Sequence, residues 1–127
     1  MYKEVVICII IIAIIVSLDI FTQKYTQSTT SEITQIFADL KGDMLDEDKN
    51  KIDEKVKALD EMWGKKHDRL AYYIEHDELE KVDTAIVSLK SYVETDDYSS
   101  AIAELDEGKF ILEHIQKKYA FNLENIF

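Results

Sequence analysis

The sequence contains no proline, and its 127 residues include only three glycines, one cysteine and one arginine. Without proline, and with glycine only at Gly42, Gly64 and Gly108, it has little of the turn chemistry that all-β folds, phosphate-binding loops and nucleophile elbows need. A single cysteine, Cys8, excludes an intrachain disulfide and a cysteine-based zinc cluster. The class that remains is an all-α fold in one small domain.

Positive charge is also scarce. The chain has 26 Asp and Glu against 15 Lys and Arg, which gives a net charge of −11 at pH 7. Affinity for nucleic acid comes largely from Lys and Arg side chains that neutralise phosphates, and Arg69 is the sole arginine. We therefore expect no nucleic-acid partner.

The most specific pattern present is an apolar run near the N-terminus. Val5 to Leu18 read VVICIIIIAIIVSL without a charge, and after Asp19 the run continues through Ile20 and Phe21. As a helix, residues 5–21 would span about 26 Å, slightly less than the hydrocarbon core of a bilayer, which is about 30 Å thick. The run predicts a single transmembrane helix whose partner is the lipid bilayer.

Two other interpretations of this run are a cleaved signal peptide and a buried core helix. Cleavage requires small residues in an A-x-A-like pattern, whereas the run continues SLDIFTQKYTQ with large or charged residues. A retained signal anchor is therefore favoured. The N-terminal amine and Lys3, weighed against Lys24, indicate a cytoplasmic N-terminus and an extracytoplasmic remainder in the cell membrane.

The rest of the chain predicts two parts. Residues 1–27 would form the anchor and a short polar tether, because Gln23 to Thr30 read QKYTQSTT, and residues 28–127 would form an acidic helical domain. Apolar residues spaced by three and four predict helices over about 31–45 and 50–74, a third from Asp77, and a fourth opened by Asp96 and Asp97 that frays near Asn122. Short connections predict a three- to four-helix antiparallel bundle.

Helix ends and seams give further expectations. Thr29 with Glu32, and Asp77 with Glu80, have the spacing of capping boxes at the starts of the first and third helices. Trp63 falls on the apolar seam of the second helix, which favours core packing over a role as an anchor for a partner helix.

The acidic segment from Asp43 to Glu54 resembles a calcium-binding loop only in part. Asp46, Asp48 and Asn50 match the first three ligand positions of an EF-hand, but lysines occupy the glycine and closing glutamate positions. We expect an acidic helix start that interacts with the helix dipole, with any divalent cation bound weakly and diffusely.

The three histidines, His67, His76 and His114, do not form an HExxH pattern, and structural roles are favoured over metal binding. Glutamates such as Glu75, Glu78 and Glu113 are too common in this chain for a carboxylate pair to indicate catalysis. No serine stands in a Gly-x-Ser-x-Gly context, and Cys8 lies in the apolar run. The sequence therefore predicts no catalytic, cofactor-binding or metal-binding residues, and a protein that is not an enzyme.

Nearly the whole chain resembles a known family. After the Ile-rich anchor, the segments EKVKALDEMWGKKHDRLAYYIEHDELEKVD, SLKSYVETDD, AELDEGKFILEHI and NLENIF resemble the domain-of-unknown-function family 4363, small membrane-anchored helical proteins of Firmicutes without an assigned activity. The residues that carry the resemblance are Trp63, His76, Glu78, Leu89, Tyr92, Glu104, Leu105, His114 and Ile115. The resemblance implies a YetF-like membrane protein as a candidate partner.

The function expected from these features is association. The chain would be a single-pass membrane protein whose extracytoplasmic helical bundle acts as an interaction or accessory module for a membrane partner, or forms a homo-oligomer. The alternative is a ligand or cation sensor, in which the Asp46 region or a pocket near His76 binds a small molecule or ion and changes the packing of the bundle.

Overall fold

A computed structural model describes residues 1–126 of the chain and the side chains of residues 1–120. The described residues form four helices and no strand: α1 (Tyr2–Leu45), α2 (Lys49–Leu70), α3 (His76–Glu94) and α4 (Tyr98–Ile126). The connections between them are short, so successive helices run antiparallel. The predicted all-α antiparallel bundle is confirmed.

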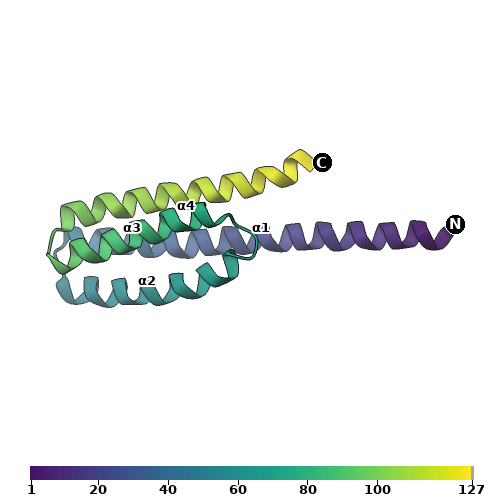
Figure 1. Cartoon of the computed structure of the whole chain (residues 1–127). Coiled ribbons are helices and arrows are strands. Elements are labelled where there is room, and N and C mark those ends of the chain that lie inside the picture. Colours follow the sequence, from purple (N-terminus) through teal and green to yellow (C-terminus); the bar gives the residue numbers. More distant parts are fainter. Residues whose placement is uncertain (127) are drawn as a thin grey trace.

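The helices form a ring of neighbours. α1 packs against α2 and α4, and α3 packs against α4 and, less extensively, against α2. Figure 1 shows the α1–α2 and α3–α4 connections at one end of the bundle and the α2–α3 connection at the other. The N-terminal part of α1 extends beyond this second end, next to the α2–α3 connection (Figure 1).

The core consists of the seam residues that the three- and four-residue spacing predicts. Each helix turns one apolar face inward because residues three or four apart share a face. The fully buried large side chains are Ile33, Leu40, Met44, Ile52, Leu59, Leu79, Val82, Leu89, Leu105, Leu112 and Ile115. All four helices contribute to this list, so none of them can be removed without opening the core.

The polar tether predicted at Gln23 to Thr30 is wrong, because these residues are an uninterrupted part of α1. The segment contains no proline or glycine, and one of its hydroxyls bonds within the helix: Thr26 Oγ1 donates to the carbonyl of Thr22 at 2.8 Å. Thr26, Thr29 and Thr30 are buried against the rest of the bundle. The polarity of this segment therefore reflects a packed helix face that contains threonine.

Two of the predicted helix starts are also corrected. Thr29 and Glu32 lie inside α1 and cap nothing, and α3 begins at His76 after Glu75, one residue earlier than Asp77. The acidic starts of the other helices do cap: the Asp48 carboxylate accepts from the Lys51 amide at 3.3 Å, and the Asp97 carboxylate accepts from the Ser100 amide at 3.2 Å. α2 ends at Leu70, and the chain then turns through residues 71–75, although helix was expected up to residue 74.

Candidate functional site

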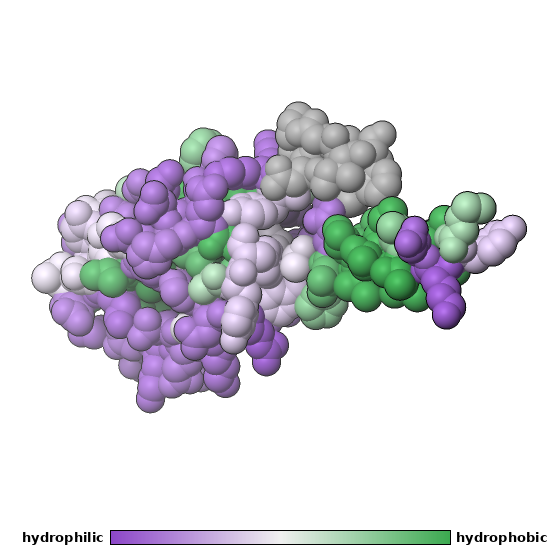
Figure 2. All heavy atoms as spheres, turned by 45° about the vertical axis from the view of Figure 1, so that its right-hand side comes forward, coloured by the Kyte–Doolittle hydropathy of each residue, from purple (hydrophilic) through white to green (hydrophobic). Residues whose placement is uncertain are grey.

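The first candidate surface is the apolar part of α1, which lies outside the bundle. It is the one helix of the described chain that is long and apolar enough to cross a membrane, and its most apolar stretch of 18 residues has no buried residue. The large side chains from Val5 to Phe21 are about half exposed, for example Ile9 at 60% and Phe21 at 66%. Figure 2 shows this segment as a continuous hydrophobic surface projecting from a mostly hydrophilic bundle.

The junction between this segment and the bundle is held by polar contacts. The hydroxyls of Tyr73 and Thr26 lie 2.6 Å apart, and the Tyr73 hydroxyl donates to the carbonyl of Thr22 at 3.2 Å. Burial raises the pKa of Tyr73. On the neighbouring face, Lys66 lies 5.3 Å from the centre of the Tyr25 ring and 3.4 Å from a carboxylate oxygen of Glu32. Contacts from α2 and from the α2–α3 connection therefore hold α1 at the point where this helix leaves the bundle.

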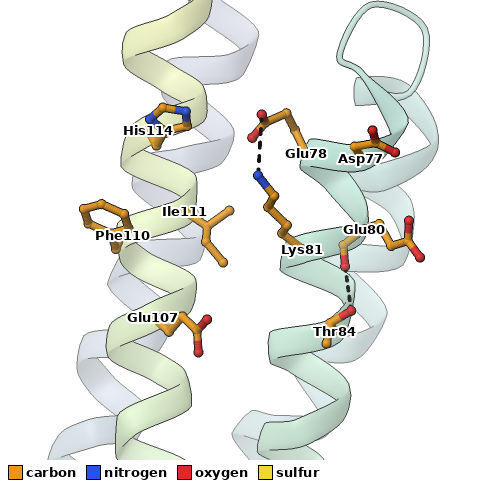
Figure 3. A pocket seen from close by; sticks show the side chains of 9 residues that line it. All are labelled: Asp77, Glu78, Glu80, Lys81, Thr84, Glu107, Phe110, Ile111 and His114. Carbon is orange, nitrogen blue, oxygen red and sulfur yellow. Dashed lines mark hydrogen bonds and ion pairs between the residues drawn. The ribbon is translucent and has the colours of Figure 1, made fainter.

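The second candidate surface is a groove between α3 and α4 with a volume of about 890 Å³. α3 contributes Asp77, Glu78, Glu80, Lys81 and Thr84 to its lining, and α4 contributes Glu107, Phe110, Ile111 and His114. In Figure 3 the side chains of Glu78 and Ile111 reach into the space between the two helices. Four of the nine lining residues are acidic, against one lysine, so the groove is anionic with an apolar component.

Glu78 is the most buried of the charged residues in this groove, at 8% exposed. Its Oε1 atom lies 3.6 Å from the Lys118 ammonium and 3.9 Å from that of Lys81. Its Oε2 atom is buried and has no hydrogen-bond partner among the described side chains and backbone. Lys118 also lies 3.5 Å from Glu75; desolvation lowers the pKa of Lys118, but Glu75 and Glu78 outweigh this effect and raise it. Of the three glutamates considered from the sequence, two thus meet at one lysine, whereas Glu113 is exposed.

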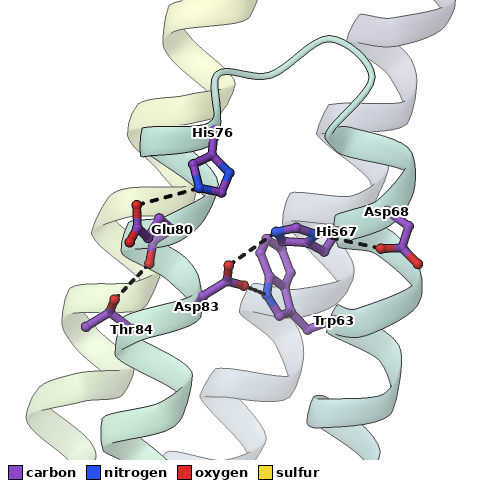
Figure 4. Close-up of polar contacts among 7 residues, drawn as sticks. All are labelled: Trp63, His67, Asp68, His76, Glu80, Asp83 and Thr84. Atoms are coloured by element: carbon purple, nitrogen blue, oxygen red, sulfur yellow. Dashed lines mark hydrogen bonds and ion pairs between the residues drawn. The ribbon is translucent and has the colours of Figure 1, made fainter.

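Trp63 is a core residue, as its seam position predicts, and is 4% exposed. Its indole Nε1 donates to Oδ1 of Asp83 at 2.6 Å, and the other carboxylate oxygen of Asp83 lies 3.2 Å from Nε2 of His67 (Figure 4). The Trp63 and His67 rings meet edge to face with centroids 5.9 Å apart. This cluster joins α2 to α3, which have the least backbone contact of the four neighbouring helix pairs.

The histidines do not converge. His67 pairs with Asp83, His76 lies 3.8 Å from Glu80 at an exposed position, and His114 lines the groove on α4. Among the described side chains of residues 1–120, no group of three or more His, Cys, Asp or Glu residues is arranged to hold a metal ion.

In the acidic segment from Asp43 to Glu54, two carboxylates bind groups of the neighbouring helix α2. Asp48 caps α2, Asp43 pairs with Lys55, and Lys49 lies 3.8 Å from Asp96 at the adjacent connection. The hydrogen bond to Asp43 is the main reason that the pKa of Lys55 is raised. The positions that resemble the first ligands of an EF-hand therefore form the end of a helical bundle.

The sequence did not single out the groove between α3 and α4 or the role of Asp83. One signal for the groove was present: Phe110 is apolar and lies off the seam defined by Leu105, Leu112 and Ile115, which predicts an exposed aromatic side chain. No comparable signal marked Asp83, because acidic residues are frequent on every helix.

Comparison with known proteins places the bundle in a family. No curated protein and no solved structure matches the chain. The family model described as Domain of unknown function (DUF4363) matches residues 20–126. This range begins near the end of the apolar run and includes the bundle part of α1 and all of α2, α3 and α4. The chain therefore belongs to the DUF4363 family.

Proposed function

We propose that residues 5–21 hold this protein in a membrane and that the bundle acts outside the cytoplasm as an interaction module for a membrane-protein partner. The observation that carries the proposal is the apolar part of α1. Its exposed isoleucines and valines would be unfavourable in water, at about 25 cal/mol per Å² of apolar surface, but suit a hydrocarbon environment. A soluble role would leave this surface uncovered.

The continuity of α1 supports a positioning role. Because one helix runs from Tyr2 to Leu45 without a break, the direction of the membrane segment sets the direction of the bundle. The contacts of Tyr73 and Lys66 at the junction stiffen this arrangement. A module fixed in this way always presents the same helix faces to neighbouring membrane proteins. Confinement to the membrane raises the effective concentration of the module near such a partner.

The partner that we propose is an integral membrane protein, with a YetF-like protein as the first candidate and a second copy of this chain as the second. In-cell crosslinking of the full-length protein with a C-terminal tag, followed by solubilisation and capture, tests this. Repeated recovery of one integral membrane protein, lost when Ile10→Lys and Ile14→Lys are introduced together, would support an accessory subunit. Recovery of the protein alone would support the homo-oligomer, and recovery of neither would contradict the proposal.

Anchoring and orientation have their own test. Alkaline extraction should leave the wild type in the membrane fraction and release the variant with Ile10→Lys and Ile14→Lys, because each lysine at mid-bilayer costs about 3 kcal/mol. In a Cys8→Ala background, Leu45→Cys, which is 68% exposed at the far end of the bundle, should react with a membrane-impermeant maleimide on intact cells. Labelling only after lysis would place the bundle in the cytoplasm.

A further inference from the structure

The groove between α3 and α4 is about two helical turns long. On α3 it runs from Asp77 to Thr84, and on α4 from Glu107 to His114, which corresponds to about 10 Å along each axis. Two turns of an α-helix are about 11 Å long, close to the length of the groove. The length of the groove therefore suits a short helical segment that lies along it, in contact with both α3 and α4.

A buried acceptor in the groove lacks a partner. Glu78 is more than nine-tenths buried, extends from α3 toward α4 (Figure 3), and keeps Oε2 without a hydrogen bond among the described residues. The two nearby lysines approach only Oε1, at distances longer than a hydrogen bond. A donor from outside the chain that reached Oε2 would remove the cost of an unsatisfied buried carboxylate oxygen.

Apolar side chains also lie along this groove. Phe110 is 70% exposed on the outer side of α4, and Ile111 reaches toward α3 (Figure 3). Val87, which is 62% exposed, lies three residues after Thr84 and so extends this side of α3 by one turn. An amphipathic partner helix docks by laying its apolar face on such exposed apolar side chains along a groove.

We propose that this groove binds a basic amphipathic helical segment of a partner protein. Large apolar side chains of that segment, such as leucine, would cover Phe110 and Ile111. One of its arginines or lysines would donate a hydrogen bond to Oε2 of Glu78. The acidic rim of Asp77, Glu80 and Glu107 complements the positive charge of such a segment. The proposal rests on the proposed interaction function and names the surface through which it operates.

The test uses the full chain in nanodiscs of zwitterionic phosphatidylcholine. The probe is a fluorescent synthetic peptide that forms a helix, with leucines at i, i+4 and i+7 on one face and a single arginine beside them. We expect saturable binding by anisotropy, weakened about tenfold by Glu78→Gln and by a similar factor by Phe110→Ser. Because Phe110 is exposed, its variant tests the groove without disturbing the core.

Matched controls separate the groove from the general acidity of the bundle. Glu54→Gln removes the same charge from an exposed site, and Leu45→Ser removes a similarly exposed apolar side chain from the other end of the bundle. Both should bind the peptide like the wild type, and a peptide with scrambled leucines should bind weakly to every variant. A diazirine on one leucine should crosslink to residues 77–84 and 107–114.

Equal weakening by Glu78→Gln and Glu54→Gln would overturn the proposal, because it would show attraction to net charge alone. Absence of saturable binding, or crosslinks outside α3 and α4, would overturn it as well. The peptide measurement does not depend on the cellular partner. If the peptide does not bind but the in-cell capture recovers a partner, the groove proposal is rejected and the proposed function still stands.

Discussion

The indole nitrogen of Trp63 donates a 2.6 Å hydrogen bond to the carboxylate of Asp83, twenty residues away on the facing helix. Trp63 is buried, whereas the side chain of Asp83 is 39% exposed and also contacts His67. Since α2 and α3 share little backbone contact, this bond is a principal link between them.

Removing the acceptor should leave the buried indole N–H unsatisfied. We expect Asp83→Ala to lower the free energy of unfolding by about 1–3 kcal/mol, measured by denaturation of the full chain in detergent micelles. In the background of Trp63→Phe, which lacks the donor, Asp83→Ala should cost less. Asp68→Asn, at an 89% exposed carboxylate beside His67, should change stability by about 0.5 kcal/mol or less. Additive effects of the Trp63 and Asp83 changes would contradict this account.

Adjacent tyrosines provide a comparison at the junction with the apolar segment. Tyr73→Phe removes the hydroxyl that contacts Thr26 and Thr22, and should destabilise the protein by about 1 kcal/mol and accelerate amide exchange at the α2–α3 corner. Tyr72→Phe changes the same group on a side chain that is 90% exposed and should have no effect. Similar exchange in the two variants would show that the Tyr73 hydroxyl does not secure the corner.

Two helical glycines should respond differently to alanine. A methyl group at Gly64 would meet nothing within 4 Å, so Gly64→Ala should stabilise the protein by about 0.5–1 kcal/mol. At Gly108 the methyl carbon would lie 3.0 Å from the Phe37 ring, where α4 approaches α1. Overpacking there should cancel or reverse the gain. Thermal unfolding of both variants checks the order, and an equal gain at Gly108 would indicate that the Phe37 ring moves freely.

Glu104 should make stability depend on pH. Burial, and then the charge of Glu107, raise the pKa of Glu104 above its ordinary value of 4.5. The folded chain thus holds this proton more tightly than the unfolded chain, and the resulting stabilisation is present below the ordinary pKa and lost as pH rises through the raised value. Glu104→Gln should therefore stabilise the protein at pH 7, by about 0.5 kcal/mol or less, and not at pH 4. Glu113→Gln, at an exposed site, is the control, and a gain that persists in acid would contradict the assignment.

Calcium should not stabilise the bundle specifically. Asp48 already caps α2 and Asp43 pairs with Lys55, and the segment lacks the glycine and the closing glutamate of an EF-hand. We expect no saturable shift of the unfolding temperature of the full chain up to millimolar calcium. A saturable shift abolished by Asp46→Ala with Asp48→Ala would instead support the cation-sensor alternative.

Most of the helical architecture could be predicted from local patterns. Residues such as Ile33, Leu40, Ile52 and Leu59 follow helical spacing and are all buried, because a helix in water must turn one face to a core. The prediction of a polar tether failed because the position of its residues depends on a contact that is distant in sequence. The polar letters of Gln23 to Thr30 are typical of a loop, but threonine hydroxyls can bond to the preceding helical turn and pack against a tyrosine that is distant in sequence.

The sequence by itself determined the all-α class, the apolar run, the acidic balance and the inward faces of the bundle helices, since these depend on hydropathy and spacing over a few turns. Only the tertiary structure decided that α1 continues from the apolar run into the bundle, that Asp83 meets Trp63, and that Glu78 and Phe110 share one groove. These relationships depend on which helices become neighbours and in what register. That choice follows from the packing of the whole core, and polar side chains that meet across it carry no local periodic signal.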